Sequence, residues 1–141
     1  MPEKRGERAL VERWRDILAL HARTQCELDR VLHEHGLGAS DFEVLDVLAE
    51  GAVPGGDCSF RVQEIADRIH LTQSALSRLV ARLERDGLVE RAMCAEDRRG
   101  VRVLLTEKGR ALHGAVLPVQ RGVLTRMLAG EGDAAVGRQG G

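Results

Sequence analysis

Apolar residues recur every three or four positions along several stretches of the chain, and this spacing predicts a mainly helical protein. The first stretch covers residues 7–35 and is followed by glycines at positions 36 and 38. A second helix is predicted to begin at Ser40, where Glu43 three positions later suggests a capping box, and to end at the glycine at position 51. The apolar stripe of the first helix includes two polar residues and consists of Trp14, Ile17, His21, Gln25, Leu28 and Leu32.

The stretch LTQSALSRLVARLERDG, residues 71–87, predicts a helix that follows another predicted helix over residues 61–70 after a short turn. Thr72 has the side chain of a typical N-cap for this helix. One face of the helix is apolar and carries Leu76, Leu79, Val80 and Leu83. The opposite face carries side chains that donate hydrogen bonds: Gln73, Ser74, Ser77, Arg78 and Arg82. Two helices joined in this way form a helix-turn-helix.

Two β segments are predicted after this pair of helices. LVERAM and VRVLL flank the charged, turn-prone connection CAEDRRG, which suits an antiparallel hairpin, and residues 58–60 could add a short strand. Thr106 begins a last long helix, in which Pro118 should cause a kink or a local opening. The predicted fold class is mainly α with a small β hairpin, and residues 129–141 are expected to form a flexible tail.

Length and composition fit a single cytoplasmic domain. The chain has 141 residues, of which 43% are hydrophobic, and it contains no run of 18 apolar residues and no signal peptide. Its three cysteines, Cys26, Cys58 and Cys94, are more than thirty residues apart. This spacing argues against a disulfide framework and against a thiolate zinc site. We therefore expect no membrane segment and no cofactor.

The net charge of −1 conceals an uneven distribution of charge. Residues 1–60 hold 7 Lys and Arg against 12 Asp and Glu, whereas residues 61–110 hold 11 against 8. The basic excess therefore lies in the segment that contains the predicted helix-turn-helix and hairpin. Positive surface is what binding to the phosphates of nucleic acid requires, although a solvated charged face would show a similar excess.

The predicted elements suggest how the chain would contact double-stranded DNA. The second helix of a helix-turn-helix enters the major groove, and its N-terminal residues reach the base edges. Arg82 lies later in the helix, where it could contact phosphate, pair with Glu84, Asp86 or Glu90, or read a base. The residues expected at the base edges are Thr72, Gln73, Ser74, Ser77 and Arg78.

The tip of the predicted hairpin would supply a second contact with DNA. Arg98 and Arg99 on a narrow loop suit the minor groove, where negative potential is concentrated. Asp97 is expected to orient the guanidinium of Arg99 through a charge-assisted hydrogen bond.

LTQSALSRLVARLERDGLVER and the later EDRRGVRVLLTEKG together resemble the winged helix-turn-helix of the multiple antibiotic resistance regulators, the MarR family. The wing pattern of the family matches Asp97, Arg99, Val103, Leu105 and Thr106, and its recognition helix matches Ser77, Arg78, Leu83 and residues 87–89. The resemblance covers roughly residues 10–128. It implies an obligate homodimer that binds a pseudo-palindromic operator and usually represses transcription.

The resemblance also divides the chain into functional parts. It implies that residues 7–35 and 107–128 are dimerisation helices and that residues 40–105 are the winged helix-turn-helix. Family members usually end with a further amphipathic helix that completes the dimer, whereas this chain offers only DAAV among glycines. Either a short helix forms there, or the two predicted dimerisation helices hold the dimer together without it.

A small-molecule effector is a further implication of the resemblance. The family often binds a small, commonly anionic aromatic molecule between the first helix and the DNA-binding lobe. Trp14, His21 and Gln25 are the candidate pocket residues on the first helix. His21 and Gln25 could instead form hydrogen bonds across a dimer interface, since most buried polar groups have structural partners.

Metal sensing and redox sensing are alternatives within the same class of regulator. A zinc site could draw on His21, His33, His35, His113, Cys26 and Glu34. However, the i, i+4 spacing of helical zinc ligands is absent, and His33 and His35 would point to different sides of a helix. The chain has no tyrosine to stabilise a thiolate, so we expect Cys26 and Cys94 to act as small buried residues rather than as sensors.

Two function classes other than DNA binding are compared with the sequence pattern. A winged helix could use the same polar face to bind a protein, and the salt dependence of binding separates that function from DNA binding. An enzyme is disfavoured, because no nucleophile with a base, no phosphate-binding loop and no pair of carboxylates with motif spacing occurs in the sequence.

Overall fold

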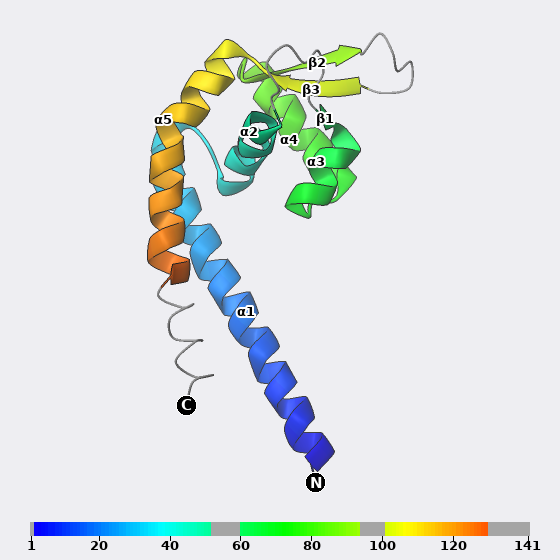
Figure 1. Ribbon diagram of the computed structural model, residues 1–141, viewed down its shortest axis with the longest axis vertical. Coiled ribbons are helices and arrows are strands. Elements are labelled where there is room, and N and C mark those ends of the chain that lie inside the picture. The colour runs from blue at the N-terminus through cyan, green and yellow to red at the C-terminus, as the bar shows by residue number, and fades with distance from the viewer. Residues whose placement is uncertain (1, 52–59, 94–100, 130–141) are drawn as a thin grey trace.

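The computed structural model describes residues 2–51, 60–93 and 101–129. It confirms the prediction of a mainly helical chain with a small antiparallel sheet (Figure 1). The elements in chain order are α1 (Pro2–Leu32), the short 3₁₀ helix η1 (His33–His35), α2 (Ala39–Glu50), β1 (Phe60–Arg61), α3 (Val62–Ile69), α4 (Gln73–Arg85), β2 (Val89–Met93), β3 (Val101–Leu105), α5 (Glu107–Leu124) and the π-helical turn η2 (Thr125–Ala129).

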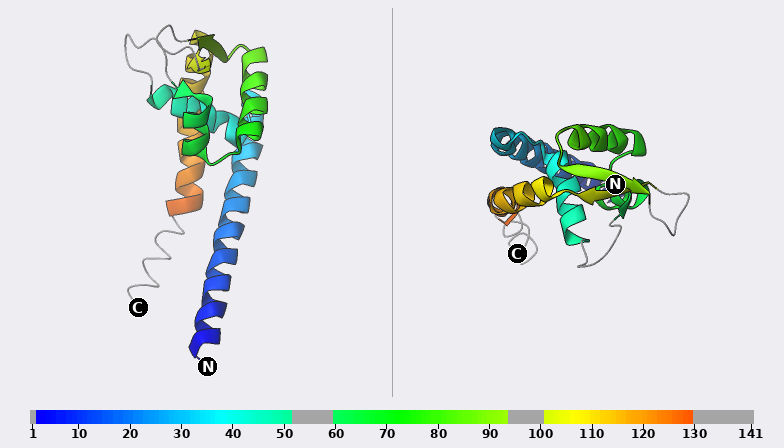
Figure 2. Two further views of the ribbon diagram at one scale, coloured as in Figure 1. Left: turned by 90° about the vertical axis from the view of Figure 1, so that its right-hand side faces the viewer. Right: turned by 90° about the horizontal axis from the view of Figure 1, so that it is seen from above.

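Helix α1 is a long rod, and the other elements gather around its C-terminal half (Figures 1 and 2). Helix α5 packs beside that half, and α2 contacts α1, α5 and the helix-turn-helix formed by α3 and α4. The N-terminal half of α1 extends beyond the rest of the described chain in each view along its length. Among the described residues, that half of the helix has no packing neighbour.

Two carboxylates cap the start of α2. Asp41 Oδ2 accepts a hydrogen bond from the amide of Gly38, and Asp29 Oδ1 accepts one from the amide of Ala39, each at 2.7 Å. The predicted capping box of Ser40 with Glu43 is therefore wrong, because the helix begins one residue earlier and Asp41 occupies the reciprocal position. Both caps leave Glu43 available for other contacts.

The turn between α3 and α4 follows the predicted pattern. Helix α3 ends at His70, which has a left-handed backbone conformation with φ of 57°. The side chain of Thr72 then caps α4, since its Oγ1 accepts a hydrogen bond from the amide of Ala75 at 3.1 Å. A left-handed Gly87, with φ of 76°, follows α4 and turns the chain toward the sheet.

The three-stranded antiparallel sheet has the order β1-β3-β2. Val89 pairs with Leu105 and Met93 pairs with Val101, which confirms the predicted hairpin strands. Residues 94–100, the predicted hairpin tip, lie outside the described residues. The strand predicted over residues 58–60 is observed as β1, in which Phe60 pairs with Val103, and its first two predicted residues are not described.

The hydrophobic core is centred on α2. Phe42, Leu45 and Leu48 of this helix are almost completely inaccessible to solvent, together with Leu76 and Leu83 of α4. Thr106, at which the last long helix is predicted to begin, is the N-cap of α5, since its Oγ1 accepts a hydrogen bond from the amide of Gly109, and α5 remains helical on both sides of its proline. The predicted tail from residue 130 onward lies outside the described residues. The core therefore holds the helix-turn-helix, the sheet and the long helices in one unit.

Candidate nucleic-acid interface and adjoining pocket

Helix α4 separates its buried residues from its polar ones. Its apolar stripe, Leu76 to Leu83, is buried in the core. The side chains predicted to reach base edges are all exposed, and they are Thr72, Gln73, Ser74, Ser77 and Arg78. Helix α4 thus presents an uninterrupted face of hydrogen-bond donors near its N-terminus, which is the end that a recognition helix directs at DNA.

Arg82 has a structural partner. Its Nη2 donates a hydrogen bond to Oδ1 of Asp41, which is buried and also caps α2. This ion pair joins the C-terminal half of α4 to the start of α2. None of the partners considered from the sequence is involved, because Asp41 lies 41 positions away and is brought close only by the fold.

The strands of the hairpin place further arginines on the same lobe. Arg91 lies 3.7 Å from Glu84, and Arg102 lies 3.8 Å from Glu64. Both pairs connect the sheet to a helix of the helix-turn-helix. Asp97, Arg98 and Arg99, the residues predicted at the hairpin tip, lie outside the described residues.

A buried polar cluster connects α2 to α5. His113 Nε2 lies 2.8 Å from Asp46 Oδ1, and the ring of His113 stacks on Phe42 with centroids 5.3 Å apart. Arg121 donates to both oxygens of Asp46, at 3.2 and 3.0 Å, and to Oε1 of Gln120 at 2.6 Å. Sequence reasoning considered His113 only as a zinc ligand and missed its carboxylate partner.

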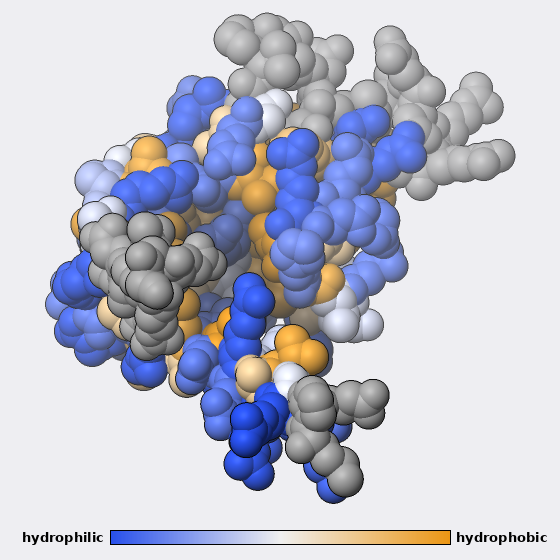
Figure 3. All heavy atoms as spheres, turned by 60° about the horizontal axis from the view of Figure 1, so that its bottom comes forward, coloured by the Kyte–Doolittle hydropathy of each residue, from blue (hydrophilic) through white to orange (hydrophobic). Residues whose placement is uncertain are grey.

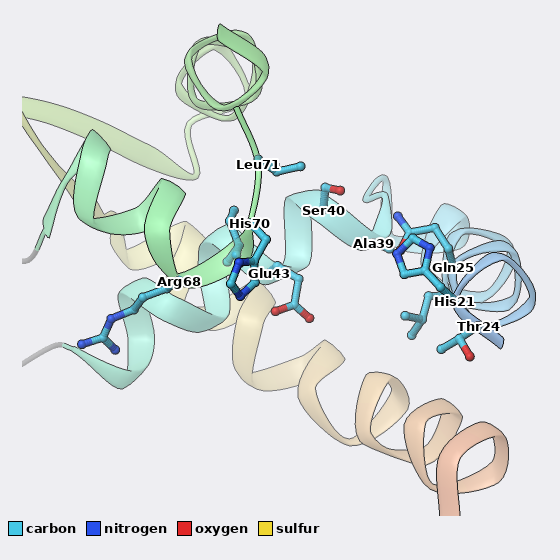
Figure 4. A pocket seen from close by; sticks show the side chains of 11 residues that line it. His21, Thr24, Gln25, Ala39, Ser40, Glu43, Arg68, His70 and Leu71 are labelled. Atoms are coloured by element: carbon cyan, nitrogen blue, oxygen red, sulfur yellow. The ribbon is translucent and has the colours of Figure 1, made fainter. Parts of the chain in front are cut away.

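A cavity of about 570 Å³ opens between α1, the start of α2 and the turn between α3 and α4 (Figure 4). His21 and Gln25 line it, whereas the third expected pocket residue, Trp14, does not. The fold adds Thr24 and Leu28 of α1, residues 39, 40 and 43 of α2, and residues 68–71. These additions come from three segments far apart in sequence, so no local pattern could have indicated them.

Glu43 is the acidic residue of this pocket. Its side chain points into the space beside His70 (Figure 4). Burial is the main cause that raises the pKa of Glu43 above 4.5, and the negative charge of Asp46 raises it further, against an opposing effect of Arg121. Among the described residues, Gln120 Nε2 donates a hydrogen bond to Glu43 Oε1 over a long distance of 3.4 Å. The carboxylate is thus poorly compensated by protein groups.

The remaining sequence expectations concern cysteines, metals and membranes. Cys26 is exposed, so the expectation that it is a small buried residue is wrong for the described chain. Cys58 and Cys94 lie outside the described residues. Within residues 2–51, 60–93 and 101–129, no three His, Cys, Asp or Glu side chains are grouped to hold a metal ion. No helix in those ranges is long and apolar enough to cross a membrane.

Comparisons with known proteins point to one family. A sequence model of the MarR family matches residues 35–100. The chain is 29% identical to the HTH-type transcriptional regulator MhqR of Bacillus subtilis, over 72% of this chain and 66% of the relative. It is 37% identical to the regulator TtmR of Methylorubrum extorquens, over 72% of this chain and 50% of the relative. The chain thus spans half to two thirds of the length of these regulators, which are not enzymes.

A solved structure extends the similarity to almost the whole chain. Sco3205, a MarR family transcriptional regulator from Streptomyces coelicolor crystallised in complex with DNA, is 28% identical to this chain. The match covers 94% of this chain and 82% of that structure, with a TM-score of 0.75. The similarity therefore includes the long helices as well as the lobe with α4 and the hairpin.

The raised pKa of Glu43 predicts a pH-dependent stability difference. The native state holds the Glu43 proton more tightly than the unfolded state, so this group stabilises the fold below pH 4.5 and the contribution is lost as pH rises through the native pKa. Glu43→Gln cannot ionise. We expect its free energy of unfolding to increase relative to the parent protein as pH rises from about 4 to 7.

Urea denaturation at several pH values measures this difference. Glu90→Gln, a substitution of an exposed acid on β2 whose charge is not among the causes of the Glu43 shift, is the matched control and should show a nearly constant difference from the parent protein. A constant difference for Glu43→Gln as well would contradict the assignment.

Proposed function

Because the chain belongs to the MarR family, we propose that it is a cytoplasmic, homodimeric regulator of transcription that binds a pseudo-palindromic operator in double-stranded DNA. The observation that carries the proposal is the division of α4 into a buried apolar stripe and an exposed donor face, beside an antiparallel hairpin. Repression is the expected effect, because a dimer seated on an operator blocks access to the same DNA.

Helix α4 would lie in the major groove. The capped N-terminus of α4 would face the DNA, with Gln73, Ser74, Ser77 and Arg78 over the base edges. Arg98 and Arg99, at the tip of the hairpin, would contact the minor groove, with Asp97 holding Arg99 in position. Arg82 would contribute chiefly by fixing α4 on α2, because its guanidinium is paired with Asp41.

An unpartnered apolar stripe on α1 supports the homodimer. Leu10 is 67% exposed, Trp14 57% and Ile17 50%, and all three face the same side of the projecting half of the helix. Figure 3 shows hydrophobic residues at the surface among hydrophilic ones, including on this projecting segment. A second copy of the chain would cover the stripe, and an obligate dimer of this kind generally buries about 2,000 Å² or more.

The cavity beside α1 is the proposed effector site. It is bounded by a helix assigned to the dimer and by the turn of the helix-turn-helix. A ligand there would contact both the dimer helix and the helix-turn-helix and would change the distance between the two recognition helices of the dimer. Binding to DNA requires that distance to be about one DNA turn, about 34 Å. His21 and Gln25 would contact the ligand from α1.

Substitutions of arginine test the DNA interface. Arg78→Ala should relax base preference at a cost of roughly 1 to 3 kcal/mol, because Arg78 is exposed among the groove-facing residues. Arg99→Ala should weaken binding to all duplexes and flatten the dependence on salt. Arg82→Ala, four positions after Arg78, is the matched control and should mainly lower folding stability by leaving buried Asp41 unpaired.

Fluorescence anisotropy with labelled duplexes over roughly 50 to 200 mM salt measures these effects. If the protein contacts about six or more phosphates, raising the salt concentration over that range should lower its affinity for the duplex about 1,000-fold. Unchanged DNA affinity in both Arg78→Ala and Arg99→Ala would defeat the assignment. An affinity that does not change with salt concentration would instead support the hypothesis of a protein partner.

Charges placed on the apolar stripe test the dimer. Trp14→Glu and Ile17→Glu should each shift the protein toward monomer, because a carboxylate would be buried without a partner at the interface. Ala19→Glu is the matched control, since position 19 lies roughly on the opposite side of the same helix. Sedimentation equilibrium gives the oligomeric state, and a monomeric parent protein or two fully dimeric stripe variants would exclude this interface.

A further inference from the structure

The pocket beside α1 contains acceptor groups that lack adequate partners. Glu43 is half-buried, and the hydrogen bond that it accepts from Gln120 in the described part of the chain is 3.4 Å long. Thr24 is only 8% exposed, and its Oγ1 is buried without any hydrogen-bond partner among the described residues. Burying polar atoms without partners costs free energy. A ligand that donates hydrogen bonds to them would remove that cost.

The positive groups near the pocket are already committed elsewhere. Arg68 has its guanidinium 4.9 Å from the centre of the Phe60 ring, and its side chain extends away from the other labelled residues in Figure 4. The N-terminus of α2 also borders the pocket, and free amides at a helix N-terminus commonly bind anions. Here Asp41 and Asp29 already accept from its first amides.

The charges behind the pocket also disfavour an anionic ligand. The negative charge of Asp46 raises the pKa of Glu43, and Arg121, whose charge lowers it, is bound to both oxygens of Asp46. His21 and His70 are the other titratable groups on the walls. An anion in this cavity would therefore be repelled by Glu43 and Asp46, while Arg68, the arginine among the lining residues, is directed toward Phe60.

The walls suit a flat, apolar body. Leu28, Ile69 and Leu71 supply aliphatic surface, and the rings of His21 and His70 enter from opposite sides in Figure 4. The volume of about 570 Å³ is within the usual range for a small organic ligand. Aromatic rings fill such a cavity while leaving one polar end to reach Glu43.

We propose that this pocket takes an aromatic or heteroaromatic cation, bearing a protonated amine or amidine, with Glu43 as its counter-ion and Thr24 as a second hydrogen-bond partner. This inference rests on the proposed function insofar as the pocket is its effector site. It departs from the anionic aromatic effector that the family resemblance implies. The difference follows from the carboxylate in the cavity and from the carboxylates that cap α2.

Three probes of one ring size and different charge test the proposal. Benzamidinium, neutral benzamide and benzoate are titrated into the full chain by calorimetry at constant ionic strength and without DNA. Benzamidinium should bind at least about tenfold more tightly than benzoate, and benzamide should lie between them. Perturbed ring signals of His21 and His70 in NMR spectra should accompany binding, which places the probe in the pocket.

Substitution then identifies the counter-ion. Glu43→Gln should weaken benzamidinium at least about fivefold and leave benzoate equal or stronger, whereas Glu90→Gln, on an exposed strand position, should change neither. Benzoate binding as tightly as benzamidinium, an unchanged benzamidinium affinity in Glu43→Gln, or no binding of benzamidinium below about 10 mM would overturn the proposal. The ranking of probes in the parent protein stands even if the variant fails to fold.

The test is independent of DNA binding. If duplex binding fails while benzamidinium still binds at the pocket through Glu43, the proposed function is wrong and the ligand class is right. If duplex binding holds and the ranking of the probes is reversed, only the ligand class is wrong.

Discussion

Helix α2 is enclosed on nearly every side, and the arrangement of the other elements depends on its burial. Eight of its twelve residues are buried, including Phe42, Leu45 and Leu48 at the centre of the core. It contacts both long helices as well as α3, α4 and β3. Because a closely packed helix moves only together with its neighbours, a displacement of α1 or α5 would be transmitted through α2 to α4, the proposed recognition helix.

Three acidic residues of α2 contact, or face, the elements packed around this helix. Asp41 binds Arg82 of α4, Asp46 binds His113 and Arg121 of α5, and Glu43 faces the cavity beside α1. The first two carboxylates are satisfied by cations or an imidazole, whereas Glu43 is not. These carboxylates thus provide one polar connection within the lobe, from α2 to α4, one connection from α2 to the long helix α5, and one acceptor in the cavity beside α1.

Local patterns were sufficient to predict the elements but not the partners of polar residues. The apolar stripe of α4, the Thr72 cap and the hairpin strands each depend on neighbours in sequence, and all were predicted. The capping box of α2 was assigned to Ser40 with Glu43, but a second, overlapping pattern occurs there. In the structure Gly38 is the N-cap and Asp41 occupies the reciprocal position. The partner of Arg82 could not be predicted, since it lies 41 positions away. Likewise, His21 and Gln25 were visible as polar interruptions of the stripe on α1, whereas Trp14, the third candidate, does not line the pocket and Glu43 became apparent only in three dimensions.

Selection of bound sequences from a random duplex pool, with the full chain at physiological salt, tests the central claim most directly. Two copies of α4 related by a twofold axis should enrich an inverted repeat whose half-sites are about one helical turn apart, about 10 base pairs centre to centre. Enrichment of a single half-site without a symmetric partner, or no enrichment over the starting pool, would contradict the account of a dimer that reads DNA through this helix.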